Sequence, residues 1–178
     1  MFFSTLKAFT QEKEQNTTNV SKATIIEPGF AHEFPAGRNQ TFFARAGITA
    51  TFDNNDPYGG SSLGKILFRG FVSGSFRVYY NFEKRKLKEK NTDRNSANYF
   101  ALLTIVATKP FNKPKYDMRL DNPILNAGIV WGLQRNFPSR FSLDLNIGLG
   151  YGKVGSETGI IPIGEFNIGF WLGEKKNE

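Results

Sequence analysis

The chain has 178 residues, among them 18 glycines and 18 phenylalanines, and a formal net charge of +7. This length suits one domain, and the absence of cysteine excludes a disulfide framework and thiol chemistry. The basic residues are spread along the chain except for a run at 83–94 that is typical of a solvated turn, so nucleic-acid binding is not indicated. No apolar run approaches the ~18 residues of a membrane-spanning helix.

The first third of the chain contains only weak strand signals. Residues 2–10 alternate poorly between apolar and polar, a polar loop follows at 11–21, and residues 22–34 form a poor strand that contains Pro28. A strand tolerates proline at an edge, at a bulge or at its first residue. We therefore predict strands at 2–10 and 22–34, with a tight turn at 35–39.

Strong alternation begins at residue 41 and predicts two long strands, at 41–53 and 66–82. Their even positions carry mainly apolar side chains, whereas their odd positions include arginine, serine and threonine. A period of two places successive side chains on opposite faces of a strand. Asp-Pro and Gly-Gly between the two strands predict a loop at 54–64.

The second half predicts four more strands, at 97–107, 125–134, 141–152 and 160–172. In 141–152, the odd positions from Phe141 to Tyr151 are all apolar and the even positions are all polar or glycine. This strand is about twice the ~5–6 residues of a soluble strand and suits the ~9–11 residues that cross an outer membrane. In 97–107 we assign the uncharged odd row, which includes Tyr99, to the outer face.

These patterns predict an all-β protein: a closed antiparallel up-and-down transmembrane β-barrel of eight strands, forming one domain over residues 1–178. The turns at 35–39, 83–95 and 136–139 are assigned to the periplasmic side, and the loops at 54–64, 109–123 and 153–158 to the outside. An even strand number then requires the first strand within residues 1–21, and residues 173–178 form a polar tail. The start of the chain lacks signal-peptide features, so for an outer-membrane location we expect a mature or truncated form whose signal peptide is missing.

The inward rows carry charged residues that either line a narrow pore or cross-link the interior. An eight-stranded barrel is only wide enough for side chains to fill, and an unpaired buried charge costs several kcal/mol. We therefore expect a plugged interior with a lumen polar network of Glu27, Glu33, Arg45, Arg69, Arg77, Asp144 and Glu165.

Aromatic residues gather where the outward rows approach the periplasmic end of the predicted barrel. Aromatic rings at such positions sit among lipid headgroups at a membrane interface. The predicted aromatic girdle consists of Phe34, Phe42, Tyr80, Phe82, Tyr99, Phe137, Phe141 and Phe170.

Two stretches resemble hairpins of small outer-membrane β-barrel proteins of Gram-negative bacteria. One is Arg77-Val-Tyr-Tyr-Asn-Phe-Glu-Lys-Arg85 with its continuation to Tyr99, and the other combines Gly132-Leu-Gln-Arg135 with residues 141–152. The resemblance covers under a third of the chain and implies a porin-like or OmpA-like transmembrane barrel, with outer-membrane lipid and the barrel-insertion machinery as partners. It implies no functional residues. Such proteins often end on an aromatic residue, whereas here a polar tail follows residue 172.

Beside a structural, docking or narrow porin-like role, two alternatives stay open. A soluble lipocalin-like barrel that binds a small apolar ligand turns its apolar rows inward and carries many Lys and Glu outside. The polar rows of 41–53, 125–134 and 141–152 contain no lysine, which disfavours this alternative. The second alternative is an accessory subunit of a larger outer-membrane complex.

No enzyme, cofactor or metal site is predicted. The exception to consider is a lipid-modifying barrel enzyme, which places a Ser and a His on the barrel surface. The single histidine, His32, has phenylalanines two positions away on either side in its row, and no Ser, Thr or Asp. An interfacial role is therefore expected for His32, although a triad assembled in space is not excluded, and a single histidine without cysteine disfavours metal binding.

Overall fold

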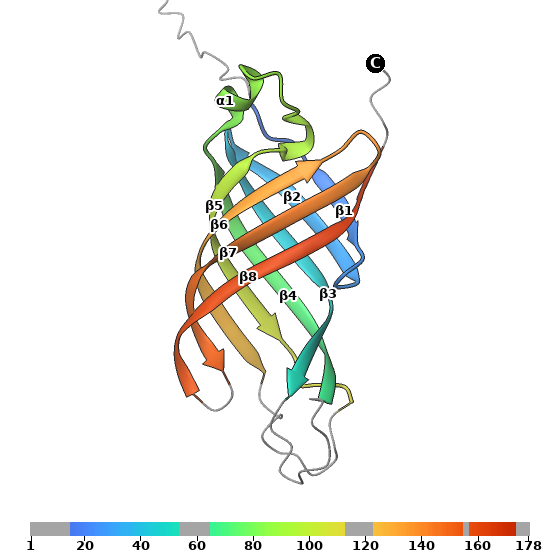
Figure 1. Cartoon of the computed structure of the whole chain (residues 1–178), viewed down its shortest axis with the longest axis vertical. Coiled ribbons are helices and arrows are strands. Elements are labelled where there is room, and N and C mark those ends of the chain that lie inside the picture. The colour runs from blue at the N-terminus through green and yellow to red at the C-terminus, as the bar shows by residue number, and fades with distance from the viewer. Residues whose placement is uncertain (1–14, 54–64, 113–122, 155–156, 174–178) are drawn as a thin grey trace, which may run out of the picture.

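The computed structural model describes residues 15–53, 65–112, 123–154 and 157–173, which form an antiparallel sheet of eight strands closed into a barrel (Figure 1). Neighbours in sequence are neighbours in the sheet, and β1 pairs with β8 to close the ring. The predicted eight-stranded up-and-down antiparallel barrel is confirmed. The strands are β1 (Val20–Thr24), β2 (Gly29–Gly37), β3 (Gln40–Asp53), β4 (Lys65–Tyr79), β5 (Asn98–Ala107), β6 (Ile124–Asn136), β7 (Phe141–Val154) and β8 (Glu157–Leu172).

The prediction of one strand at 22–34 is wrong, because the chain turns back at residues 25–28 to make the β1–β2 hairpin. Thr24 Oγ1 donates to the carbonyl of Glu27 across this turn (2.6 Å). Pro28 falls in the turn, where its missing amide hydrogen removes no bond from the middle of a ladder. The hairpin supplies the eighth strand without residues 2–10, which lie outside the described residues.

Most strands place the predicted rows on the predicted faces. In β7, Ile147 and Leu149 are well exposed, while Ser142, Asp144 and Asn146 are buried. The described side chains of β3, β4, β6 and β8 follow the same rule, with apolar rows outside and the charged positions of the inner rows buried. A period of two therefore sorts these strands correctly.

The face assigned to β5 is wrong. Tyr99 and Leu103 are fully buried, whereas Phe100 and Leu102 of the opposite row are more than half exposed. Both rows of this strand are largely apolar, so alternation alone does not distinguish them. The register decides, because directly paired residues share a face and Tyr99 pairs with the inward-facing Tyr79.

The hairpin is shorter than its neighbours, so the barrel wall is not hydrogen-bonded over its full height. β8 pairs with β1 only at residues 169–172, and β3 pairs with β2 only at residues 40–47. Beyond the turn, the facing edges of β3 and β8 have no strand partner among the described residues (Figure 1).

Pro162 lies on this open edge of β8. The amide of Ile25 donates to the carbonyl of Ile168 (2.8 Å), so the even-numbered residues of β8 turn their backbone groups toward β1. Beyond the turn, the same residues face the open edge. Pro162 is one of these residues, and it has no amide hydrogen. An unpaired strand edge is a position at which a strand tolerates proline.

The connection between β4 and β5 folds over one end of the barrel and contains α1 (Phe82–Lys86) and the short η1 (Asp93–Asn95) (Figure 1). Asn95 is buried and ties this cap to the N-terminal segment, since it accepts from the amide of Thr18 (2.8 Å) and donates to its carbonyl (2.9 Å). Phe82 is also buried, which corrects its predicted place in the aromatic girdle. β4 ends at Tyr79, and the helix turns the Phe82 ring inward against the Tyr79 ring, with 5.1 Å between centroids.

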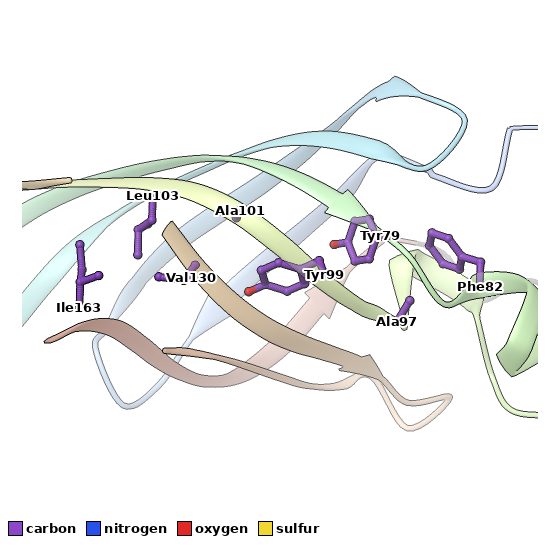
Figure 2. Packing of buried hydrophobic residues seen from close by; sticks show 8 residues of the cluster. All are labelled: Tyr79, Phe82, Ala97, Tyr99, Ala101, Leu103, Val130 and Ile163. Atoms are coloured by element: carbon purple, nitrogen blue, oxygen red, sulfur yellow. The ribbon is translucent and has the colours of Figure 1, made fainter. Parts of the chain in front are cut away.

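Apolar side chains fill part of the barrel interior. Figure 2 shows buried residues that extend from Tyr79 near the cap, past Tyr99, to Leu103, Val130 and Ile163. The last three come from β5, β6 and β8 and are almost fully buried, so they form a packed apolar layer inside the barrel. In the part of the chain that the structure describes, no helix combines the length and apolar character needed to cross a membrane.

Candidate functional site

Arg77 on β4 is the centre of the polar interior. It is fully buried, and Nη1 donates to Asp144 Oδ2 on β7 (2.7 Å) and to Gln134 Oε1 on β6 (2.8 Å). Its guanidinium carbon lies 3.7 Å from the Phe43 ring centroid and 4.4 Å from that of Tyr99. The Tyr99 hydroxyl in turn donates to Asp144 Oδ1 (2.6 Å). Charge-assisted hydrogen bonds and cation–π contacts therefore stabilise this cation away from solvent.

Glu33 on β2 is the second anchor of the network. Its carboxylate accepts from Thr41 Oγ1 on β3 (2.7 Å), the Tyr79 hydroxyl on β4 (2.5 Å) and Gln134 Nε2 on β6 (2.9 Å). Gln134 therefore joins Glu33 to Arg77, because its amide oxygen accepts from the arginine. A single buried carboxylate thus cross-links strands from opposite parts of the wall.

A second cluster surrounds Arg45 on β3, close to the β1–β2 turn. Arg45 Nη2 donates to Glu165 Oε1 on β8 (3.0 Å) and to Glu27 Oε2 (2.5 Å). Glu27 also accepts from Thr49 Oγ1 (2.6 Å), and Glu165 accepts from Ser73 Oγ (2.8 Å). Glu27 thus belongs to a turn rather than to a strand, yet its side chain reaches inward and fixes the hairpin to β3.

The structure brings together six of the seven residues predicted for the interior, in these two clusters. Asn146 connects the clusters, because its amide nitrogen lies 3.4 Å from the Tyr99 hydroxyl and its oxygen accepts from the amide of Glu165 (3.0 Å). The seventh, Arg69, is buried and donates to the carbonyl of Thr108 (2.8 Å).

Lys22 is an interior cation that sequence reasoning missed. If residues 22–34 formed a single strand with Glu27 and Glu33 inward, Lys22 would point outward. Because the turn at 25–28 separates two strands, the even residues of β1 face inward, and Lys22 is one of them. Lys22 Nζ lies 4.0 Å from Asp144 Oδ2. Together with Asn167 it lines a cavity of about 10 Å³, room for about one water molecule.

The charges that the structure describes on the inner face balance. Four carboxylates and four cations lie there, so the interior carries no net charge from these groups. They are Glu27, Glu33, Asp144 and Glu165 on one side, and Lys22, Arg45, Arg69 and Arg77 on the other.

Most of the predicted aromatic girdle lies on the outer surface. The residues placed there, exposed or half-buried, are Phe34, Phe42, Tyr80, Phe137, Phe141 and Phe170. Tyr99 and Phe82 point inward instead, as described above. Phe100 takes the outer position next to Tyr80, with 5.4 Å between ring centroids, and Trp131 Nε1 donates to the Tyr80 hydroxyl (2.9 Å).

His32 has a partner that its own row does not reveal. The β1–β2 hairpin pairs it directly with Ser21, and Ser21 Oγ lies 2.8 Å from His32 Nδ1. The Phe34 ring packs against the imidazole in a tilted arrangement, with 4.2 Å between centroids. The sequence pattern does not reveal Ser21 as a partner, because it predicts one strand at 22–34 where the structure forms the β1–β2 hairpin.

The interior is built to cross-link the barrel rather than to bind a ligand. Arg45 and Arg77 bond to carboxylates, Glu33 accepts from three neutral side chains, and the two tyrosine hydroxyls donate to carboxylates. The cavity beside Lys22 has room for about one water molecule. Within the described ranges, no group of three or more potential metal-ligating side chains occurs. Comparison of the chain with protein-family models, curated proteins and solved structures finds no match.

Proposed function

We propose that this chain is an integral outer-membrane β-barrel with a closed interior and a structural or docking role. The observation that carries the proposal is the inversion of the two faces. Large apolar side chains such as Leu102, Ile129 and Ile147 are at least 60% exposed, while eight charged side chains lie inside. A contiguous apolar surface of this kind is unfavourable in water and favourable against lipid.

The height of the apolar surface supports the same location. The outward row of β8 is free of charge from Ile160 to Leu172. At about 3.3 Å per residue and a tilt of about 40°, this stretch spans about 30 Å, close to the thickness of a bilayer's hydrocarbon core. The two hairpins that resemble those of small outer-membrane barrels agree with this location.

The filled interior supports a barrel that does not conduct. Arg77 and its partners cross the interior at one level, and Leu103, Val130 and Ile163 pack at another. The cap adds a third barrier, because Asn95 binds it to the N-terminal segment. This role differs from that of a porin, whose wide lumen holds an aqueous channel.

The open edges of β3 and β8 define where water reaches the barrel wall. An unpaired backbone group in hydrocarbon costs several kcal/mol, so such groups must face protein or water. Thr49 and Thr51, both half-buried residues, lie on the β3 side of the opening, and the side chain of Glu27 in the β1–β2 turn is 28% exposed. We infer that water wets this part of the wall.

The soluble lipocalin-like alternative fits the two faces poorly. Such a barrel lines its cavity with apolar side chains and exposes polar ones, whereas here Arg77, Glu33 and Asp144 are buried inside. An accessory subunit of a larger outer-membrane complex fits the exposed apolar surface as well as a barrel surrounded only by lipid does. Docking is therefore part of the proposed role.

Purification tests the proposal. The protein should require detergent for extraction, and the folded barrel should migrate differently from the heated protein on a gel. A monodisperse protein that is stable in buffer without detergent would overturn the proposed location and favour the lipocalin-like alternative.

A further inference from the structure

Ser21 and His32 form a hydroxyl–imidazole pair on the outer face of the barrel. They are direct partners on β1 and β2, and Ser21 Oγ lies 2.8 Å from His32 Nδ1. Both side chains are half-buried, so each keeps surface that a ligand can reach. This distance is within the range that joins a nucleophile to its general base.

The sheet holds both groups in place. β1 pairs with β2 on one side and with β8 on the other, so Ser21 lies between His32 and Leu172. The Phe34 ring packs beside the imidazole and restricts its rotation. Positions on paired strands are more rigid than positions on loops, which favours a preorganised pair.

The surroundings of the pair are apolar and exposed. Phe30 and Phe34 flank His32 in its row and are 51% and 47% exposed, and Leu172 beside Ser21 is 46% exposed. Across β3, His32 faces Ala44, a small residue that leaves the imidazole uncovered on that side. A substrate that approaches Ser21 therefore meets an apolar surface.

We propose that Ser21 and His32 hydrolyse carboxylic esters that carry an apolar chain, such as the acyl esters of membrane lipids. Ser21 is the nucleophile and His32 is its general base. The assignment of lipid as the source of the ester rests on the proposed membrane location, whereas the nucleophile–base pair itself does not.

The reaction balances with water as the only co-reactant. Ser21 Oγ forms a bond to the ester carbonyl carbon while its proton passes to His32 Nδ1, which must be the unprotonated ring nitrogen. The carbon–oxygen bond to the alcohol then breaks, and His32 returns the proton to the leaving alkoxide. Water attacks the acyl-serine with His32 again as base, which releases a carboxylic acid and restores the Ser21 hydroxyl.

The test uses the folded, detergent-solubilised chain with two probes: p-nitrophenyl dodecanoate as substrate and an alkyl fluorophosphonate as a covalent label. Mass spectrometry should locate the phosphonate on Ser21, and Ser21→Ala should abolish both labelling and hydrolysis. His32→Gln should reduce the hydrolysis rate by about 10²–10⁴-fold, the usual contribution of a general base. Ser139→Ala is the matched control, because Ser139 is an exposed serine with no histidine partner among the described residues, and this variant should react as the parent chain does.

Absence of both labelling and hydrolysis in the folded parent chain would overturn the proposal, as would activity that survives in Ser21→Ala. The acyl chain of the probe tests the substrate class, since the apolar surroundings predict faster hydrolysis of the dodecanoate than of p-nitrophenyl acetate. Preference for the acetate would contradict a lipid-like substrate. Heat-modifiable migration of the same samples reports the fold, and the need for detergent reports the membrane location, so failure of the proposed location is distinguishable from failure of the pair.

Discussion

Replacement of Asp144 by asparagine tests whether the barrel interior is a closed network or a wet channel. Asp144 is buried and accepts from Arg77 (2.7 Å) and from the Tyr99 hydroxyl (2.6 Å), and Lys22 lies 4.0 Å away. Asp144→Asn keeps the shape of the side chain but removes the carboxylate that, among the described residues, bonds to Arg77. Removing one partner of a buried ion pair costs about 3–5 kcal/mol, because the other charge remains buried.

Urea unfolding of the detergent-solubilised barrel measures this cost. With a slope of about 2 kcal/mol per M, the midpoint should fall by roughly 2 M. The matched control is Glu83→Gln, which removes the carboxylate of an exposed pair with Arg38 (3.2 Å) and should cost less than about 1 kcal/mol. If Asp144→Asn costs no more than Glu83→Gln, water screens the interior charges, and the closed interior is refuted.

Three further predictions follow from the cap, the outer face and the interior. Asn95→Ala removes both hydrogen bonds to Thr18 and should lower the free energy of unfolding by about 1–3 kcal/mol, measured by urea titration. The control is Asn19→Ala, because Asn19 is exposed, and equal effects of the two variants would contradict the role of Asn95. Leu145→Arg should impair folding into vesicles by about 2–4 kcal/mol, whereas Leu145→Met, which keeps an apolar side chain at the same position, should fold normally; normal folding of Leu145→Arg would contradict a lipid-facing Leu145. Planar-bilayer recording of the parent chain should show no steady conductance, and a stable large pore would contradict the filled interior.

Much of the barrel follows from the sequence because a period of two is visible wherever one face is polar. The row from Phe141 to Tyr151 is apolar while the alternate row is polar or glycine, so β7 could be assigned in length and face. Interior charges such as Arg77 and Asp144 could be named for the same reason. Which of them bond to one another could not be predicted, because that depends on the shear between strands distant in sequence.

The failures have two physical causes. β5 is largely apolar on both rows, so its orientation depends on pairing with β4, and alternation alone predicts the wrong face for Tyr99. The turn at 25–28 begins with Ile25 and Ile26, both at least half exposed, and these apolar residues continue the strand pattern up to the turn signal of Pro28-Gly29. A prediction without this turn places Lys22 on the outer face and does not pair Ser21 with His32.

The central claim is that the apolar outer face contacts lipid, and site-directed spin labelling tests it most directly. The chain has no cysteine, so single cysteines at 146 and 147 can be labelled without other changes. In vesicles, a label at Ile147, which is 63% exposed, should be accessible to lipid-dissolved oxygen and shielded from a water-soluble relaxer. A label at the buried Asn146 should lack that oxygen preference. If both labels respond to the water-soluble relaxer, or if the preference is reversed, the outer face does not contact lipid.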